Sequence, residues 1–183
     1  ENGTNYSICL LEKGSEIGAH ILSGNVFQPN ALDELLPNWK ELGAPLNTPV
    51  KKDKLLFLLE KIGIPVPSFL MPPMNNHGNY VISLGNLCRW LGEQAESLGV
   101  EVFPGFPASQ LIIENDKVVG VQTGDMGISE SGELKPGHEP GINIRAKYTI
   151  LGEGCRGHLG KQVIHKFNLS ENKDPQHLSL IHI

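Results

Sequence analysis

The chain has 183 residues, of which 39% are hydrophobic and 19% charged, a composition typical of a folded globular protein and not of a disordered or fibrous one. Its formal net charge of −5 argues against nucleic acid as the main partner. The cysteines Cys9, Cys88 and Cys155 lie far apart without a Cys-x-x-Cys pair, so the sequence predicts neither a disulfide framework nor a metal site.

The first predicted element is the apolar run of residues 8–11, which is long enough for a buried parallel strand and too short for a helix. The run ends at Glu12, and an acid at the carboxyl end of such a strand is where a Rossmann sheet binds a ribose hydroxyl. The phosphate-binding Gly-x-Gly-x-x-Gly normally lies about 20 residues earlier. Glu12 is the twelfth residue, so we expect that loop to lie outside this chain. On spacing alone, a solvated loop acid is the more common role for such a residue, and ribose binding is the alternative.

Small residues follow in the stretch 17–24, where Gly18, Ser23 and Gly24 would let the backbone lie close to a flat ring. His20 in the same stretch is either a flavin contact or an ordinary hydrogen-bonded loop histidine. Residues 31–42 are predicted to form a short helix, with Asn30 as N-cap and an end imposed by Pro37. One apolar face is expected to pack inside the protein or to dip into a membrane surface; it comprises Phe27, Leu32, Leu35, Leu36 and Trp39.

The middle of the chain alternates strands and one clear helix. The proline-broken residues 62–74 favour edge strands or a hairpin, and a strand at 80–83 precedes a helix that ends at Gly99. Its apolar stripe is predicted to comprise Leu87, Trp90, Leu91, Gln94, Ala95 and Leu98. A parallel strand is expected at 100–103, a hairpin turns at Asn115–Asp116, and residues 126–140 form a loop or hairpin tip.

A second glycine turn follows a predicted long strand at 142–151. Its backbone amides at Gly152, Glu153, Gly154 and Gly157 are able to approach a phosphate or ribityl chain, although a simple strand–helix corner has the same pattern. Together with the acid-ended first strand, this order is typical of FAD-dependent oxidoreductases whose dinucleotide and substrate domains are interleaved. No residues form a Ser-His-Asp or paired-carboxylate pattern, so the chain has no predicted catalytic residue or metal ligand, and redox chemistry would belong to the cofactor.

Longer strings resemble the electron transfer flavoprotein–ubiquinone oxidoreductase family over residues 7–176. They include Leu-Leu-Glu-Lys at 10–13, Ile-Gly-Ala-His at 17–20, Gly-Ala-Pro-Leu-Asn-Thr-Pro at 43–49, Met-Asn-Asn-His-Gly-Asn-Tyr at 74–80, Trp-Leu-Gly-Glu-Gln-Ala-Glu at 90–96 and Glu-Gly-Cys-Arg-Gly-His-Leu at 153–159. The resemblance implies an electron-transferring-flavoprotein dehydrogenase on the matrix side of the mitochondrial inner membrane. Its partners would be electron transfer flavoprotein and ubiquinone, and its cofactors FAD and a [4Fe-4S] cluster.

The resemblance also implies roles for individual residues. The cofactor-binding set would be Glu12, Lys13, Gly18, His20, Ser23, Gly24, Gly152, Glu153, Gly154, Arg156 and Gly157. Residues 21–42 would match a segment that contacts the membrane peripherally without spanning it. The three cysteines do not match the family's cluster ligands, so we expect the cluster only in a longer parent protein.

The expected fold class is α/β: an incomplete FAD/NAD(P)-binding domain, Rossmann-like and of the glutathione-reductase type, with an inserted α+β part that faces quinone and membrane. Residues 1–24 and 76–177 would form the FAD-binding domain, 25–75 the insertion, and 178–183 an aberrant tail. Two alternatives stay open. One is a related flavin-dependent reductase, of the geranylgeranyl reductase or FixC type. The other is an inactive membrane-surface fragment, since the isolated chain is expected to lack activity.

Overall fold

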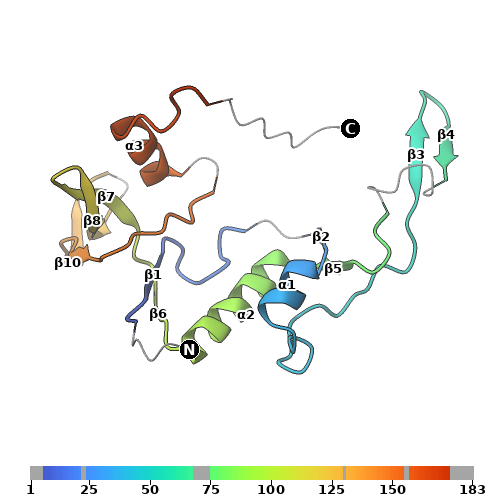
Figure 1. The fold of residues 1–183 in the computed structure, drawn as a ribbon, viewed down its shortest axis with the longest axis horizontal. Helices are drawn as coiled ribbons and strands as arrows, with labels where there is room; N and C mark the ends of the chain where they lie inside the picture. The colour runs from blue at the N-terminus through green and yellow to red at the C-terminus, as the bar shows by residue number, and fades with distance from the viewer. Residues whose placement is uncertain (1–5, 22–23, 68–74, 130, 155–156, 174–183) are drawn as a thin grey trace. The chain divides into compact units, whose positions relative to one another are not determined.

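A computed structural model describes residues 6–21, 24–67, 75–129, 131–154 and 157–173 (Figure 1). The fold is α/β with several small sheets, and the chain divides into two compact units. The first unit comprises Glu1–Leu10 and Gly14–Pro104, and the second comprises Leu11–Lys13 and Gly105–Ile183. This division does not follow the expected boundaries at 24/25 and 75/76, so the three-part domain organisation stays a prediction. The expected tail at 178–183 lies outside the described residues.

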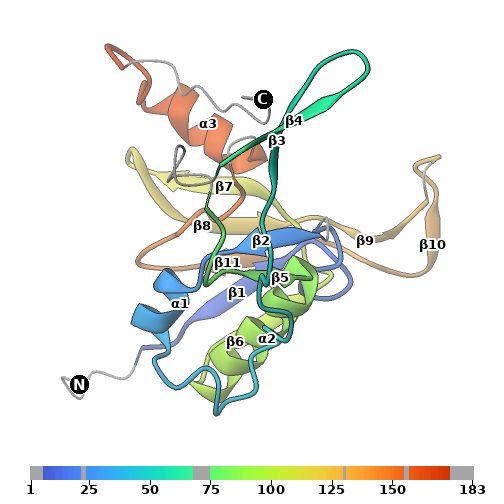
Figure 2. The same ribbon diagram turned by 90° about the vertical axis from the view of Figure 1, so that its right-hand side faces the viewer.

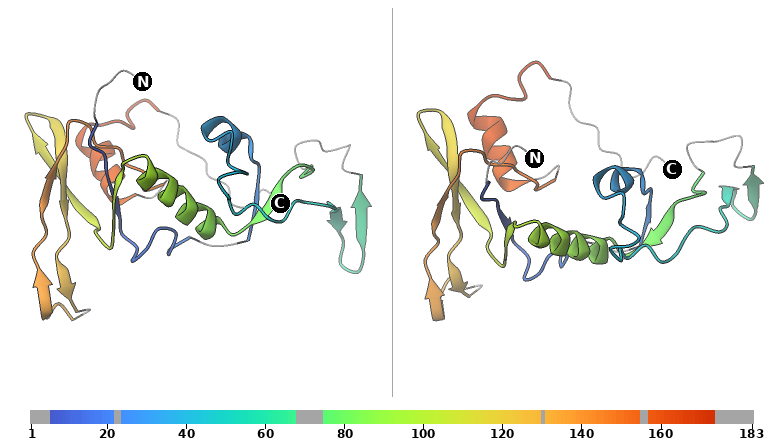
Figure 3. Two further views of the ribbon diagram at one scale, coloured as in Figure 1. Left: turned by 90° about the horizontal axis from the view of Figure 1, so that it is seen from below. Right: turned by 60° about the horizontal axis from the view of Figure 1, so that its bottom comes forward.

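Among its described residues, the first unit contains two helices and three strand pairs. Helix α1 spans Asn30–Leu35 and α2 spans Leu84–Ser97. Strand β1 (Cys9–Glu12), which runs on into the second unit, pairs with β6 (Glu101–Pro104). Strand β2 (Asn25–Phe27) is antiparallel to β5 (Tyr80–Ile82), and β3 (Leu55–Leu58) is antiparallel to β4 (Gly63–Val66). Both views in Figure 3 show β3 and β4 as a two-stranded ribbon. Only β4 falls within the stretch 62–74 where edge strands or a hairpin are expected; its partner β3 precedes that stretch, and residues 68–74 lie outside the described residues.

The two strands predicted to be parallel, at 8–11 and 100–103, pair with each other in the structure, but the predicted burial of β1 is wrong. The carbonyl of Ile8 accepts from the amide of Glu101 at 2.9 Å and that of Glu12 accepts from Phe106 at 3.0 Å. Residue numbers therefore rise together along the two strands, as in a parallel pair. Ile8 is 52% exposed and Leu10 39% exposed. The reason is that no third strand of the described chain extends this pair, so its apolar side chains remain uncovered.

A hydrophobic cluster holds α1, the turn after it, β5 and α2 together (Figure 1). Its buried members are Leu32, Trp39, Ala44, Leu46, Ile82, Leu87 and Trp90. The indole of Trp39 donates to the Asp33 carboxylate at 2.7 Å, and its ring meets the edge of Tyr80 at 5.9 Å between centroids. The indole of Trp90 donates to the carbonyl of Leu42 at 3.1 Å. Both tryptophans are therefore buried with their polar atoms satisfied, as buried indoles require.

Helix α2 confirms the sequence prediction, whereas α1 differs from it. Ser83 caps α2, and Gly99 follows it with a φ of +89°, the left-handed conformation that glycine adopts readily. Leu98 lies off the buried stripe and is 79% exposed. Helix α1 has only six residues and no side-chain cap, so the prediction of Asn30 as N-cap is wrong. It ends early because the residue before Pro37 is disfavoured in helical conformation.

The second unit is built on the antiparallel sheet β11–β8–β7. Its strands are β7 (Ala108–Glu114), β8 (Lys117–Thr123) and β11 (Asn143–Arg145), and β9 (Met126–Ile128) pairs with β10 (Leu134–Glu139). Helix α3 (His158–Lys166) packs beside β7 (Figure 2). Asn115 and Asp116 have φ values of +48° and +55°, as a two-residue hairpin turn of type I′ requires. The hairpin predicted at this dipeptide is confirmed.

The long strand predicted at 142–151 is wrong, because β11 ends at Arg145. Beyond it the amide of Ala146 donates to the Val119 carbonyl, and the structure assigns no pairing to residues 147–151. Tyr148 and Ile150 are 87% and 92% exposed. An apolar run forms a strand only beside a partner, and the described residues provide none here.

Candidate functional site

Glu12 lies where the sequence predicts it, at the carboxyl end of a parallel strand. Its side chain is half-buried, and Lys13 beside it is exposed. The carbonyl of Glu12 is bonded to the Phe106 amide, so the strand end is fixed against the chain that follows β6. The geometry agrees with the position of a ribose-binding acid, and the role itself stays a prediction.

The loop after β1 turns onto α2. Gly18 has a φ of +83°, and a Cβ placed on it would lie 2.5 Å from the carbonyl oxygen of Gly85. Gly18 is therefore packed against its own chain, while His20 nearby is exposed. Ser23 and Arg156, two further predicted cofactor residues, lie outside the described residues.

The predicted glycines divide into a packed and an open group. A Cβ built on Gly24, Gly152 or Gly154 would meet no described atom within 4 Å. A Cβ on Gly157 would lie 2.5 Å from the Cβ of Glu153. The open group leaves backbone accessible to a ligand, as a phosphate or ribityl chain needs. Within the second unit, Glu12 and the open Gly152 and Gly154 leave room for a cofactor, but glycines outside the predicted set, such as Gly43 and Gly132, are equally open, so the cofactor role stays a prediction. Gly24 belongs to the first unit.

Glu153 has a structural task that the sequence analysis missed. Its Oε1 accepts the amide of Leu159 at 3.2 Å and its Oε2 accepts the amide of Gly160 at 2.8 Å. These amides belong to the first turn of α3 and have no partner within the helix. The carboxylate therefore caps α3 and also complements the positive end of the helix dipole. A sequence signal existed, since an acid precedes a predicted helix start, but its spacing is longer than that of a usual N-cap.

Two of the predicted membrane-contacting residues have almost no exposed surface. Leu32 and Trp39 are each 4% exposed, inside the hydrophobic cluster, while Phe27 and Leu36 pack against it. Leu35 is the most exposed residue of the predicted set, at 69%. Non-local packing against β5 and α2 explains this burial, so Leu32 and Trp39 have no surface to offer to lipid in this conformation.

A second apolar surface, which the sequence analysis did not single out, covers the β3–β4 hairpin. Its large side chains are 45–73% exposed and comprise Leu56, Phe57, Leu58, Leu59, Ile62 and Ile64. Soluble monomers rarely expose so many neighbouring apolar side chains without a binding role. The lysines Lys51, Lys52 and Lys54 precede the hairpin and are exposed. The sequence signal for this exposed surface was the apolar run 55–59, followed by a second strand that no other described element covers.

The described ranges contain neither a metal site nor a membrane-spanning helix. There, no group of three or more His, Cys, Asp or Glu side chains is arranged to hold a metal ion. No helix in the described part of the chain is long and apolar enough to cross a membrane. Partial burial, and then the charge of Glu101, raise the pKa of the Cys9 thiol. A raised pKa disfavours the reactive thiolate, so Cys9 does not have the character of a nucleophile.

No family model matches the chain. The chain is 55% identical over 184 residues to electron transfer flavoprotein-ubiquinone oxidoreductase of Pseudomonas aeruginosa, covering 98% of this chain and 33% of that protein. It is 53% identical over 170 residues to the mitochondrial protein of that name from Bos taurus, covering 92% and 28% respectively. A crystal structure of FqzB matches 64% of this chain and 26% of its own, with 18% identity and a TM-score of 0.43, too weak a likeness to assign the fold.

The chain thus spans about a third of the length of the curated relatives it matches. Identity at this level over nearly the whole chain makes it a homologue of that part of these proteins, and the family resemblance predicted from the sequence strings is confirmed.

Proposed function

We propose that this chain is part of an oxidoreductase that passes electrons from reduced electron transfer flavoprotein, through FAD, to ubiquinone. The observation that carries the proposal is the identity of 53–55% over nearly the whole chain to relatives whose names contain both partners. Because the chain matches about a third of those relatives, the activity is proposed for the full-length protein. Bound FAD would accept and donate the electrons, and a [4Fe-4S] cluster would be held by residues other than the three cysteines present here.

The residues of this chain would bind and orient the cofactor as part of a FAD-binding domain of the glutathione-reductase type. Glu12 would accept a hydrogen bond from the adenosine ribose. The uncovered backbone at Gly24, Gly152 and Gly154 would allow close approach of the rest of the cofactor. Glu153 would support this second turn indirectly, because its carboxylate fixes the start of α3 behind it.

The β3–β4 hairpin is the surface we propose for peripheral contact with the membrane. Ubiquinone resides in lipid, so its reductase must reach the apolar layer. Phe57 and Leu58 are 61% and 73% exposed and would enter the acyl boundary, while the lysines before β3 would meet anionic headgroups. The names of the animal and plant relatives include "mitochondrial", which supports a mitochondrial location. The matrix side of the inner membrane is the location we propose, as the family resemblance implies.

The test uses the full-length protein and its Glu12→Ala variant, purified with and without added FAD. Loss of a hydrogen bond to a charged group should weaken FAD binding by roughly 1.5–3 kcal/mol, measured by flavin fluorescence after dialysis. Glu34→Ala, which removes an exposed acid on α1, is the matched control and should retain FAD.

Wild-type protein without flavin, or equal retention in the Glu12 variant, would contradict the cofactor assignment. Quinone reduction with reduced electron transfer flavoprotein distinguishes the proposed enzyme from a related flavin reductase, which would use neither partner.

A further inference from the structure

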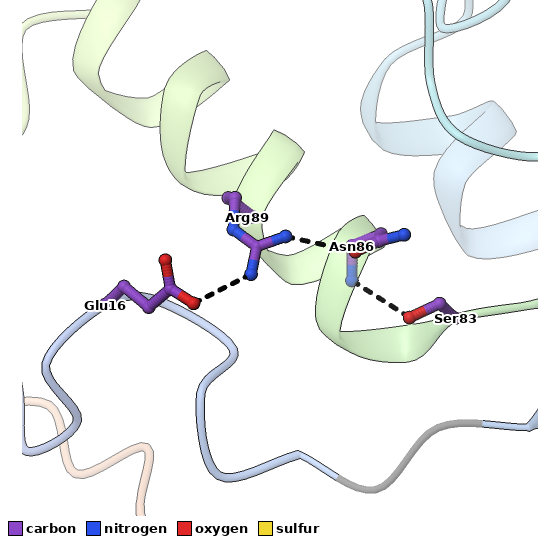
Figure 4. Close-up of polar contacts among 4 residues, drawn as sticks. All are labelled: Glu16, Ser83, Asn86 and Arg89. Carbon is purple, nitrogen blue, oxygen red and sulfur yellow. Dashed lines mark hydrogen bonds and ion pairs between the residues drawn. The ribbon is translucent and has the colours of Figure 1, made fainter.

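The loop of residues 14–21 is held on α2 by a series of hydrogen bonds that starts at Glu16 (Figure 4). Arg89 Nη2 donates to Glu16 Oε1 at 3.0 Å across 73 residues of sequence. Arg89 Nη1 donates to Asn86 Oδ1 at 3.0 Å, one turn earlier on the helix. The backbone amide of Asn86 in turn donates to the hydroxyl of the N-cap Ser83 at 3.4 Å. The guanidinium is therefore oriented by its own helix before it reaches the loop.

Two glycines of α2 let the same loop come into direct contact with the helix. A Cβ on Gly85 would lie 3.2 Å from the carbonyl oxygen of Gly18, so the two backbones touch here. A Cβ on Gly92 would lie 2.3 Å from Cδ1 of Ile17. Glycine is helix-destabilising by roughly 1 kcal/mol relative to alanine. The close approach gives each glycine a packing purpose that offsets this cost.

We propose that Gly85, Arg89 and Gly92 are positioning residues for the cofactor, because they fix the conformation of the loop 14–21. This inference rests on the proposed binding of FAD. The loop follows Glu12 directly and carries Gly18 and His20, two of the predicted cofactor residues. The glycines set the distance between loop and helix, and the Glu16–Arg89 pair sets the register along the helix.

The two kinds of contact differ in strength. The side chains of Arg89 and Glu16 are 43% and 59% exposed, and exposed pairs contribute about 0–1 kcal/mol. Arg89→Glu replaces the attraction to Glu16 with repulsion, so its effect on the loop should be larger than that of truncating Arg89. The backbone contact at Gly85 is the tighter constraint, since neither partner atom belongs to a flexible side chain.

The first measurement is hydrogen exchange of the amides of residues 14–21 in the full-length protein freed of flavin. Arg89→Glu should speed their exchange about five-fold, and the double variant Glu16→Arg/Arg89→Glu should restore it. Ser97→Ala, at an exposed position on the same helix, should leave the exchange unchanged. Equal exchange in Arg89→Glu and wild type would overturn the inference.

The second measurement is FAD binding and the visible circular dichroism of bound FAD. Gly85→Ala and Arg89→Glu should each raise the FAD dissociation constant about five-fold or more and alter the flavin signal, while the charge-swapped pair should return both to wild type. Unchanged FAD affinity and signal, in a wild type that binds FAD, would overturn the positioning role and leave the proposed function intact. A wild type that binds no FAD would overturn both, even where exchange shows that the loop is held.

Discussion

At the scale of single residues, Glu153 shows how a carboxylate next to a candidate cofactor turn serves the fold. Both of its oxygens are engaged by amides at the start of α3, one at 2.8 Å and one at 3.2 Å. Gly157 makes this possible, since any side chain there would collide with Glu153. The helix is therefore capped by its own chain and does not depend on a bound anion.

Replacing Glu153 with alanine should remove this cap and lower the free energy of unfolding by about 1 kcal/mol, the usual loss for a helix cap. Glu153→Gln keeps one acceptor oxygen but no charge, so its loss should be smaller. Urea unfolding of the full-length protein measures both, with the exposed Glu133→Ala as control. The capping role is contradicted if both Glu153 variants unfold at the wild-type midpoint.

At the scale of elements, the comparison of α1 with the β3–β4 hairpin shows what apolar spacing leaves open. The same spacing of leucines and a tryptophan suits a lipid surface and a protein core. For α1, contacts with residues far along the chain decide in favour of the protein core. Tyr80 packs on Trp39, and Ile82 and Trp90 belong to the same cluster. The hairpin has no such neighbours among the described elements, so its side chains stay exposed.

The double variant Phe57→Asp/Leu58→Asp should release the full-length protein from quinone-containing liposomes. Each fully buried side chain of this kind contributes roughly 1.5–3 kcal/mol, so the partition coefficient should fall at least ten-fold. Sedimentation with vesicles measures the effect. Leu35→Asp on α1 and Leu134→Asp on β10 are matched controls, because both leucines are exposed.

If Leu35→Asp releases the protein and the hairpin variant does not, the membrane contact lies on α1, as the family resemblance implies.

At the scale of the whole molecule, the sequence predicted local elements better than their assembly. Helix α2 and the hairpin at Asn115–Asp116 were predicted correctly because periodicity and turn chemistry encode them locally. The length of β11 and the burial of β1 were predicted wrongly, since they depend on strands elsewhere in the chain, whereas the early end of α1 follows from Pro37, as the sequence predicts.

The candidate site shows the same limit. The position of Glu12 at the end of its strand was predicted correctly. The cap at Glu153 and the contact between Gly18 and Gly85 depend on the folded arrangement of the chain, which the sequence pattern does not give. A pattern of glycines indicates where a backbone is able to come close to something. It does not tell whether that neighbour is a cofactor or another part of the chain.

The hairpin also carries a consequence for how the protein avoids self-association. The amide of Leu59 donates to Ile62 at 2.8 Å, so by antiparallel alternation the pair Leu56–Pro65 is a non-hydrogen-bonded one. The backbone nitrogen of Pro65 therefore points to the outer edge of β4, where a proline removes a donor that another chain's strand would use. We expect Pro65→Val to promote aggregation, measured by light scattering without lipid. Pro67→Val, beyond the end of β4, should not do so.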